Sequence, residues 1–208
     1  MLDNKGFDLW AYEYDKTVQE SDRRDEYPFA GYSLIMERIY SQVIQKANAK
    51  VFEIGIGTGV LAGQLYKKGH TIHGIDFSKA MISIAKSKMP HGLIIEGDVQ
   101  KGIPQAFTSH KYDAIISNYT LHHLTDEEKI TFILNLLPLL KEEGKIYIGD
   151  ISFPTRTHLE KSRVEYRNYR APDEFYFVYD EIYAKLKGHC TCEYEQISHC
   201  GGLYVISK

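Results

Sequence analysis

The chain has 208 residues, 43% of them hydrophobic, which is enough for one domain with a sizeable core and leaves no room for a second catalytic domain. Its formal charge of −3 argues against a nucleic-acid partner, and no stretch approaches the 18 apolar residues that indicate a membrane span. The sequence starts without the apolar run of an export signal, and its three cysteines, an odd number, do not indicate a disulfide framework. We therefore expect a cytoplasmic protein, monomeric or homodimeric, without a membrane partner.

Apolar runs alternate along the chain with segments of helical periodicity, which predicts an α/β fold with a mostly parallel sheet. Strands are expected near residues 51–54, 71–75, 93–95, 112–116 and 145–151, with two closing strands at 191–195 and 203–206. Apolar residues recur at helical spacing in residues 59–65, 79–86 and 130–137, which predicts helices there. Thr125 and Glu128 form a capping-box pattern before the last of these helices. We expect Pro138 to break that helix and Gly144 to end the segment.

A predicted strand leads into three glycines, Gly55, Gly57 and Gly59, and then into a helical pattern. Glycine at alternate positions lets the backbone turn tightly and lets a ligand approach the peptide groups. A dinucleotide-binding loop would need another glycine where Val60 stands. Glu53 lies two residues before the first glycine, and its carboxylate would repel a pyrophosphate. The loop therefore favours a cationic ligand that carries an amino acid.

Further polar landmarks follow the glycine loop at intervals of one strand and one helix. Asp76 precedes Phe77, Asp98 precedes Val99, and Asn118 ends the fourth predicted strand. Together with the Glu-x-Gly-x-Gly-x-Gly loop, these landmarks resemble the class I S-adenosylmethionine-dependent methyltransferases over the first three quarters of the chain. Among known groups, the chain looks most like small, poorly characterised bacillary methyltransferases. The resemblance implies a Rossmann-like seven-stranded sheet with helices on both faces and S-adenosylmethionine as the cofactor.

The resemblance also gives the landmark residues roles in cofactor binding. Glu53 and the glycine loop would hold the amino-acid end of the cofactor, Asp76 the ribose hydroxyls and Asp98 the adenine edge. Plain structural roles are the alternatives, with Asp76 capping a helix and Asp98 forming a turn. Tyr14 would contact the methionine part from an amino-terminal lid, or would instead pack with Trp10 onto the core. The expected cofactor-binding residues are Tyr14, Glu53, Gly55, Gly57, Gly59, Asp76, Phe77, Asp98, Val99 and Asn118.

Three residues are candidates for catalysis. His122 and His123 stand where related chains line the mouth of the active site, and either can act as a general base because histidine titrates near neutral pH. A structural or water-organising role is the alternative for both. Asp150, at the end of a predicted strand, is a candidate for orienting the nucleophile.

The single domain divides into four expected parts. They are an amino-terminal lid with helices at 1–45, a cofactor-binding core at 50–151, a helical substrate cover at 153–188 and closing strands at 189–208. The cover contains four arginines, Arg156, Arg163, Arg167 and Arg170. Arginine forks suit a carboxylate or phosphate on a small acidic substrate. Interleaved acidic residues, including Glu160 and Glu174, favour instead a solvated charged face.

The tail is rich in residues that can bind metal: His189, Cys190, Cys192, His199 and Cys200. A hairpin can gather such residues around zinc. The tail lacks a Cys-x-x-Cys knuckle, however, and a Cys-x-Cys pair on a strand places both side chains on one face of a core. We therefore expect no metal site in the tail.

Two functions are compatible with these patterns. The favoured one is a methyltransferase that passes a methyl group by in-line displacement to a small-molecule acceptor. The other is a cofactor-binding sensor, or a subunit that needs a partner for activity. The landmarks predict cofactor binding in both cases and leave the acceptor open.

Overall fold

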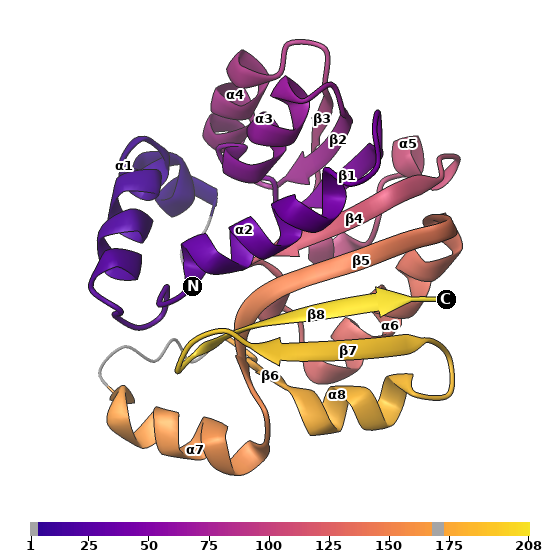
Figure 1. Ribbon diagram of the computed structural model, residues 1–208. Helices are drawn as coiled ribbons and strands as arrows, with labels where there is room; N and C mark the ends of the chain where they lie inside the picture. Colours follow the sequence, from indigo (N-terminus) through magenta and orange to yellow (C-terminus); the bar gives the residue numbers. More distant parts are fainter. Residues whose placement is uncertain (1–3, 168–172) are drawn as a thin grey trace.

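The computed structural model describes residues 4–167 and 173–208, with the side chains of residues 13–167 and 173–208. Two helices, α1 (Asn4–Arg23) and α2 (Tyr32–Val43), precede the sheet (Figure 1). The middle of the chain forms β1 (Lys50–Ile54), α3 (Val60–Lys67), β2 (Thr71–Asp76), α4 (Lys79–Lys88), β3 (Leu93–Glu96), α5 (Gln105–Thr108), β4 (Tyr112–Asn118), α6 (Asp126–Leu136) and β5 (Leu140–Phe153). The last part forms α7 (Arg156–Glu165), β6 (Phe177–Val178), α8 (Tyr179–Leu186), β7 (Thr191–Gln196) and β8 (Gly201–Ser207).

The principal sheet has the strand order β3-β2-β1-β4-β5-β8-β7. The first five strands in this order are parallel, whereas β8 runs antiparallel to both β5 and β7. The predicted seven-stranded, mostly parallel sheet is confirmed. One further strand was not expected, because β6 adds a short parallel pairing to the end of β5, inside the segment predicted to be helical.

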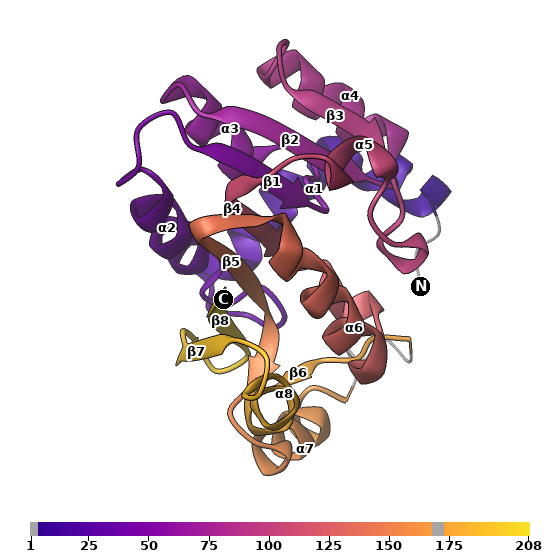
Figure 2. The ribbon, with the colours of Figure 1, turned by 90° about the vertical axis from the view of Figure 1, so that its right-hand side faces the viewer.

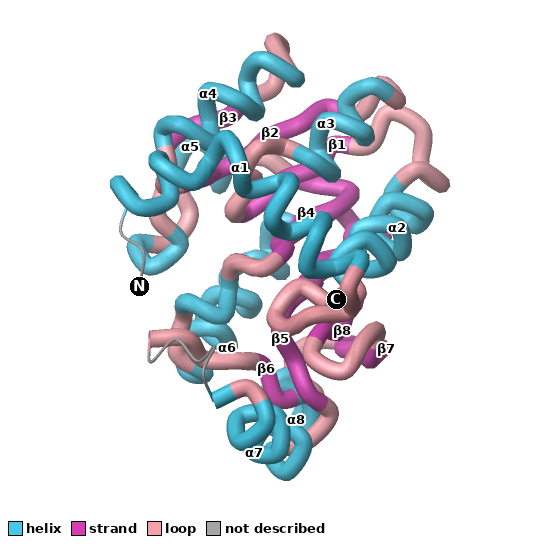
Figure 3. Tube along the Cα trace, turned by 90° about the vertical axis from the view of Figure 1, so that its left-hand side faces the viewer, coloured by secondary structure: helices cyan, strands magenta, loops and turns pink. Residues whose placement is uncertain are grey.

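Helices cover both faces of the sheet, and each face has its own core. Figure 2 shows α2 and α6 on opposite sides of β4 and β5. Apolar side chains of α2, α3, α4 and α7 fill one core, and those of α5, α6 and α8 fill the other. Helix α1 packs beside α2 and α4 (Figure 3). None of the helices in the described ranges combines the length and hydropathy that crossing a bilayer demands.

The structure confirms the predicted start of α6 and the break of this helix at Pro138, and it corrects the role expected of Gly144. Thr125 and Glu128 form the reciprocal capping box. The α-helix ends at Leu136, and a 3-10 turn that contains Pro138 follows it. Gly144 does not end this segment, because it lies inside β5, where a Cβ atom would stand 2.7 Å from a carbonyl oxygen of β4. Its lack of a side chain therefore serves strand pairing.

Candidate functional site

The strand order creates a crevice at the carboxyl ends of β1 and β4. The chain runs from β1 outward through β2 to β3 and then returns to place β4 on the other side of β1. Ligands of open α/β sheets bind at such a switch point. A cavity of about 560 Å³ lies here, within the size range of small-molecule sites. It is lined by every expected cofactor-binding residue except Gly59.

The three glycines of the loop differ in what surrounds them. Their φ angles are 69° at Gly55, 53° at Gly57 and 74° at Gly59, all in the left-handed region. A Cβ atom at Gly55 would stand 2.0 Å from the hydroxyl oxygen of Thr120. At Gly57 it would meet no described atom within 4 Å, whereas at Gly59 it would meet Met89 on the side of α4. Gly55 and Gly57 therefore shape the cavity wall, and Gly59 permits the close packing of α4.

Asp76 holds the glycine loop in place. One carboxylate oxygen accepts a hydrogen bond from the backbone N–H of Gly57 at 2.8 Å, and the other accepts one from the N–H of Ser78 at 2.9 Å. Asp98 caps a short 3-10 turn by accepting the N–H of Gln100 at 3.0 Å. The alternative role of Asp98 as a turn former is thus realised, whereas Asp76 does not cap α4, because the hydroxyl of Ser78 caps that helix. Both acids also line the cavity.

Glu53 and Asn118 face each other across the switch point, from β1 and β4. The Asn118 amide donates to one Glu53 carboxylate oxygen at 3.5 Å. The other oxygen of Glu53 and the amide oxygen of Asn118 are buried without a hydrogen-bond partner among the described residues. Burial raises the pKa of Glu53 to about 8, although the hydrogen bond from Asn118 opposes this and the charge of Asp76 adds to it. Two buried acceptors without donors fit the ammonium group of an amino-acid ligand.

Tyr14 both lines the cavity and packs against a neighbouring aromatic side chain. Its ring packs edge-on against Phe29, with ring centroids 6.4 Å apart. Burial raises the pKa of the Tyr14 hydroxyl, and nearby carboxylates led by Asp76 raise it further. The hydroxyl therefore stays protonated and can donate a hydrogen bond. The side chain of Trp10 lies outside the described part of the chain.

Asp15 ties α1 to the glycine loop and to α4. Its carboxylate accepts hydrogen bonds from the hydroxyl of Thr58 at 2.7 and 3.0 Å and lies 3.7 Å from the ammonium of Lys88. Asp15 and Thr58 both line the cavity. Neither residue belonged to the expected site, because their proximity depends on how α1 folds back onto the sheet.

His122 and Asp150 form a buried pair at the other end of the cavity. Nδ1 of His122 lies 2.7 Å from Oδ1 of Asp150, which also accepts the backbone N–H of Ile151. The other carboxylate oxygen of Asp150 accepts the backbone N–H of Leu121. Burial opposes protonation of His122, but the charge and hydrogen bond of Asp150 prevail and raise its pKa. His122 lines the cavity, whereas Asp150 stands behind it. Asp150 therefore holds the ring of His122 without lining the cavity itself.

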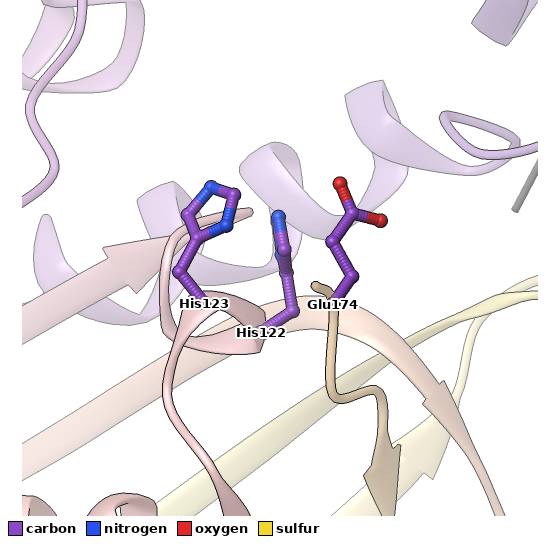
Figure 4. Close-up of side chains that lie close together, drawn as sticks. All are labelled: His122, His123 and Glu174. Atoms are coloured by element: carbon purple, nitrogen blue, oxygen red, sulfur yellow. The ribbon is translucent and has the colours of Figure 1, made fainter. Parts of the chain in front are cut away.

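His123 and Glu174 lie beside His122 (Figure 4). Burial lowers the pKa of His123 to about 4, helped by His122, so its imidazole is neutral at physiological pH. Glu174 lines the cavity and accepts a hydrogen bond from the hydroxyl of Tyr176 at 2.8 Å. The sequence marked Glu174 only as one of several acids in the cover, and no local pattern links it to the two histidines.

Lys129 connects α6 to the segment that carries Glu174. Its side chain is fully buried, its ammonium donates to the backbone carbonyl of Phe175, and it lies 2.8 Å from the carboxylate of Asp126. The same ammonium stands over the ring of Phe177, 4.8 Å from the centroid. In addition, the N–H of Phe175 donates to the carbonyl of His122 at 2.7 Å. These contacts fix the cover next to the histidines.

We expect Lys129→Met to lower the free energy of unfolding by about 1–2 kcal/mol, because the carbonyl of Phe175 loses a charged donor while the aliphatic packing is kept. Urea denaturation measures this change. Lys185→Met is the matched control, since Lys185 pairs with Glu127 at 3.5 Å between exposed side chains and should change stability by no more than about 0.5 kcal/mol. Equal stability of the two variants would contradict the anchoring role.

The arginines of the cover pair with neighbouring acids. The guanidinium of Arg156 donates two hydrogen bonds to the carboxylate of Glu181 in a bidentate pair. Nη1 of Arg163 lies 2.7 Å from Oε1 of Glu160. Arg167 is exposed, and Arg170 lies outside the described residues. None of the three described arginines lines the cavity, which supports the solvated charged face.

The cysteines of the tail do not converge. Cys192 lies in the core on one face of the sheet, with Cys190 packed beside that core, whereas Cys200 lies in the core on the other face. His199 contacts the backbone carbonyl of Asp25. The Cys-x-Cys pair therefore has its side chains on one face of a core, as the alternative to a zinc site predicted.

Comparison with known proteins agrees with this geometry. A family model described as "Methyltransferase domain" matches residues 45–197. An uncharacterised methyltransferase from Bacillus cytotoxicus is 40% identical over 75% of this chain and 70% of its own length, and one from Alkaliphilus oremlandii is 33% identical over 99% and 91%. Among solved structures, the DhpI–SAH complex has the same fold, with a TM-score of 0.71 and 16% identity over 98% of this chain and 93% of that one. The chain therefore belongs to the class I S-adenosylmethionine-dependent methyltransferases.

Proposed function

We propose that the protein transfers the methyl group of S-adenosylmethionine to a small molecule bound at the end of the cavity that His122, His123 and Glu174 line. The observation that carries this proposal is the cavity itself, which continues from the glycine loop to these three side chains. A ligand that fills only the glycine-loop end leaves the histidine end for a second molecule. The described part of the cover, residues 153–167 and 173–188, closes this end through Glu174.

When bound, the cofactor supplies an activated methyl group on a sulfonium, so the protein has to position the partners and exclude water. In the proposed arrangement, Glu53 and Asn118 hold the ammonium of the cofactor. Asp76 accepts from the ribose hydroxyls, and Asp98 lies at the adenine edge. His122 lines the end of the cavity that receives the acceptor, with its ring direction fixed by Asp150.

The test is a transfer assay with the purified chain, methyl-labelled S-adenosylmethionine and a panel of metabolites, which detects S-adenosylhomocysteine and a labelled product. Turnover of at least one small acceptor supports the proposal. Tight cofactor binding without transfer to any member of the panel would favour the sensor or partner-dependent subunit.

Two glycine variants are expected to separate cofactor binding from packing. In Gly57→Ala, the new methyl group points into open cavity space, so affinity for the cofactor should fall at least tenfold while thermal stability falls by about 1–2 kcal/mol from backbone strain. In Gly59→Ala, a similar strain is joined by a contact with Met89, so stability should fall further and affinity should change less. Calorimetric titration and thermal unfolding measure the two effects. Equal losses of affinity would contradict the separate roles.

A further inference from the structure

Three potential metal ligands meet at the acceptor end of the cavity. His122, His123 and Glu174 each offer a ligand atom, and these atoms all lie within 4.8 Å of one another. Figure 4 shows the three side chains standing side by side and pointing in the same direction, with the histidines on one turn and the glutamate on a separate segment. This is the only such group of three or more found among the described residues.

The surroundings of the cluster resemble those of a built metal site. The Asp150 carboxylate binds Nδ1 of His122 at 2.7 Å, which leaves Nε2 as the nitrogen available to an ion. Carboxylate–histidine–metal relays of this kind orient the ring and increase its basicity toward the ion. Tyr176 holds Glu174 in the same way, through a hydrogen bond of 2.8 Å. Nδ1 of His123 is buried without a hydrogen-bond partner among the described residues, so its hydrogen-bonding capacity is still to be satisfied.

We infer that His122, His123 and Glu174 bind one divalent transition-metal ion at the acceptor end of the cavity. Two imidazoles with one carboxylate suit Zn²⁺, Fe²⁺ or Co²⁺, whereas Mg²⁺ prefers a shell of oxygen atoms. Ligand atoms on one tetrahedral Zn²⁺ stand about 3.4 Å apart, so no pair of these ligand atoms has to approach by more than about 1.4 Å. None of these three ligands belongs to the His- and Cys-rich tail at residues 189–200.

The position of the ion gives it a role toward the acceptor. Three protein ligands leave at least one coordination position open, and all three residues line the cavity. An acceptor oxygen or nitrogen can bind at that position and thereby be held for methyl transfer. The described cavity lining contains no lysine or arginine, so the ion would also supply the positive charge that an anionic or chelating acceptor requires.

The test is titration of the chelator-stripped full-length protein with Zn²⁺, followed by calorimetry, and with Co²⁺, followed by visible absorption. We expect one ion per chain and no comparable binding of Mg²⁺. His123→Ala and Glu174→Gln should each weaken Zn²⁺ binding at least tenfold. His122→Ala would also remove the partner of the buried Asp150 and can therefore prevent folding. The test of the metal site thus depends on His123→Ala and Glu174→Gln.

The controls separate this site from the tail and from catalysis. His189→Ala and His199→Ala should leave the affinity unchanged, and Co²⁺ should show no thiolate charge-transfer band. Absence of stoichiometric binding, or equal affinity in wild type, His123→Ala and Glu174→Gln, would overturn the inference. Because the readout is metal binding without turnover, its failure is distinguishable from failure of the proposed transfer.

Discussion

Asp76→Ala is expected to weaken S-adenosylmethionine binding by about 2–3 kcal/mol, or roughly 30- to 150-fold. The variant loses more than the proposed ribose contacts. The carboxylate also accepts the N–H groups of Gly57 and Ser78, so its removal leaves two backbone donors without their partner and frees the glycine loop. Asp76 is buried, and water cannot easily replace these hydrogen bonds.

Isothermal titration measures this effect, with circular dichroism to show that the variant folds. Asp98→Ala is the matched control, because that carboxylate caps only a short 3-10 turn and holds no part of the glycine loop. We expect Asp98→Ala to weaken cofactor binding by about 1 kcal/mol. Unchanged affinity in a folded Asp76→Ala protein would show that the ribose assignment is wrong.

Cofactor affinity should rise about tenfold per pH unit between pH 5.5 and 7 in the wild type, and this dependence should weaken markedly in Glu53→Gln. Burial raises the pKa of Glu53 to about 8, so the free protein holds a proton there at neutral pH. The proposed pairing of Glu53 with the ammonium of the cofactor requires the ionised carboxylate, so binding should release that proton. The cofactor's own α-amino group stays largely protonated in this pH window.

The same proton makes stability depend on pH in the free protein. Because the pKa is raised from 4.5 to about 8, the folded state binds more protons than the unfolded state between these values. The contribution of Glu53 to stability is therefore most favourable below pH 4.5 and declines as pH rises toward 8. Glu53→Gln removes this decline.

Calorimetry in two buffers of different ionisation enthalpy counts the protons released on binding, and thermal unfolding across pH follows the stability. His122 also titrates with a raised pKa, so comparison with Glu53→Gln isolates the carboxyl group. If Glu53→Gln released as many protons as the wild type, the linkage would belong to another group.

The parts of the site that the sequence predicts are those encoded over short distances. The turn at Gly55 and Gly57, the acid at the end of β2 and the capping box of α6 each depend on neighbouring residues, and the structure contains all three. Asn118 was expected at the end of the fourth strand, and β4 does end there. It lies beside Glu53 because the parallel strands β1 and β4 bring their carboxyl ends to one edge of the sheet.

The remaining parts depend on tertiary packing. Gly144 reads locally as a helix end, but pairing with β4 prevails and makes it part of a strand. Glu174 reaches His122 only because Lys129 and the backbone of Phe175 fix the cover against α6 and the histidine turn. No periodic pattern in the sequence predicts this contact between the cover and the histidine turn.

Contact of the cofactor with Tyr14, which the family resemblance implies, would couple cofactor binding to the order of the amino-terminal helix, because Asp15 attaches α1 to the glycine loop. Since Asp15 holds Thr58 of the loop while Tyr14 lines the cavity, a molecule that contacts Tyr14 is bound by the docked form of the helix and not by the detached form. Mass action then shifts the population toward the docked form. Amide exchange in the second half of α1, from Glu13 to Arg23, should therefore slow as the cofactor concentration rises, so this helix reports the occupancy of the site.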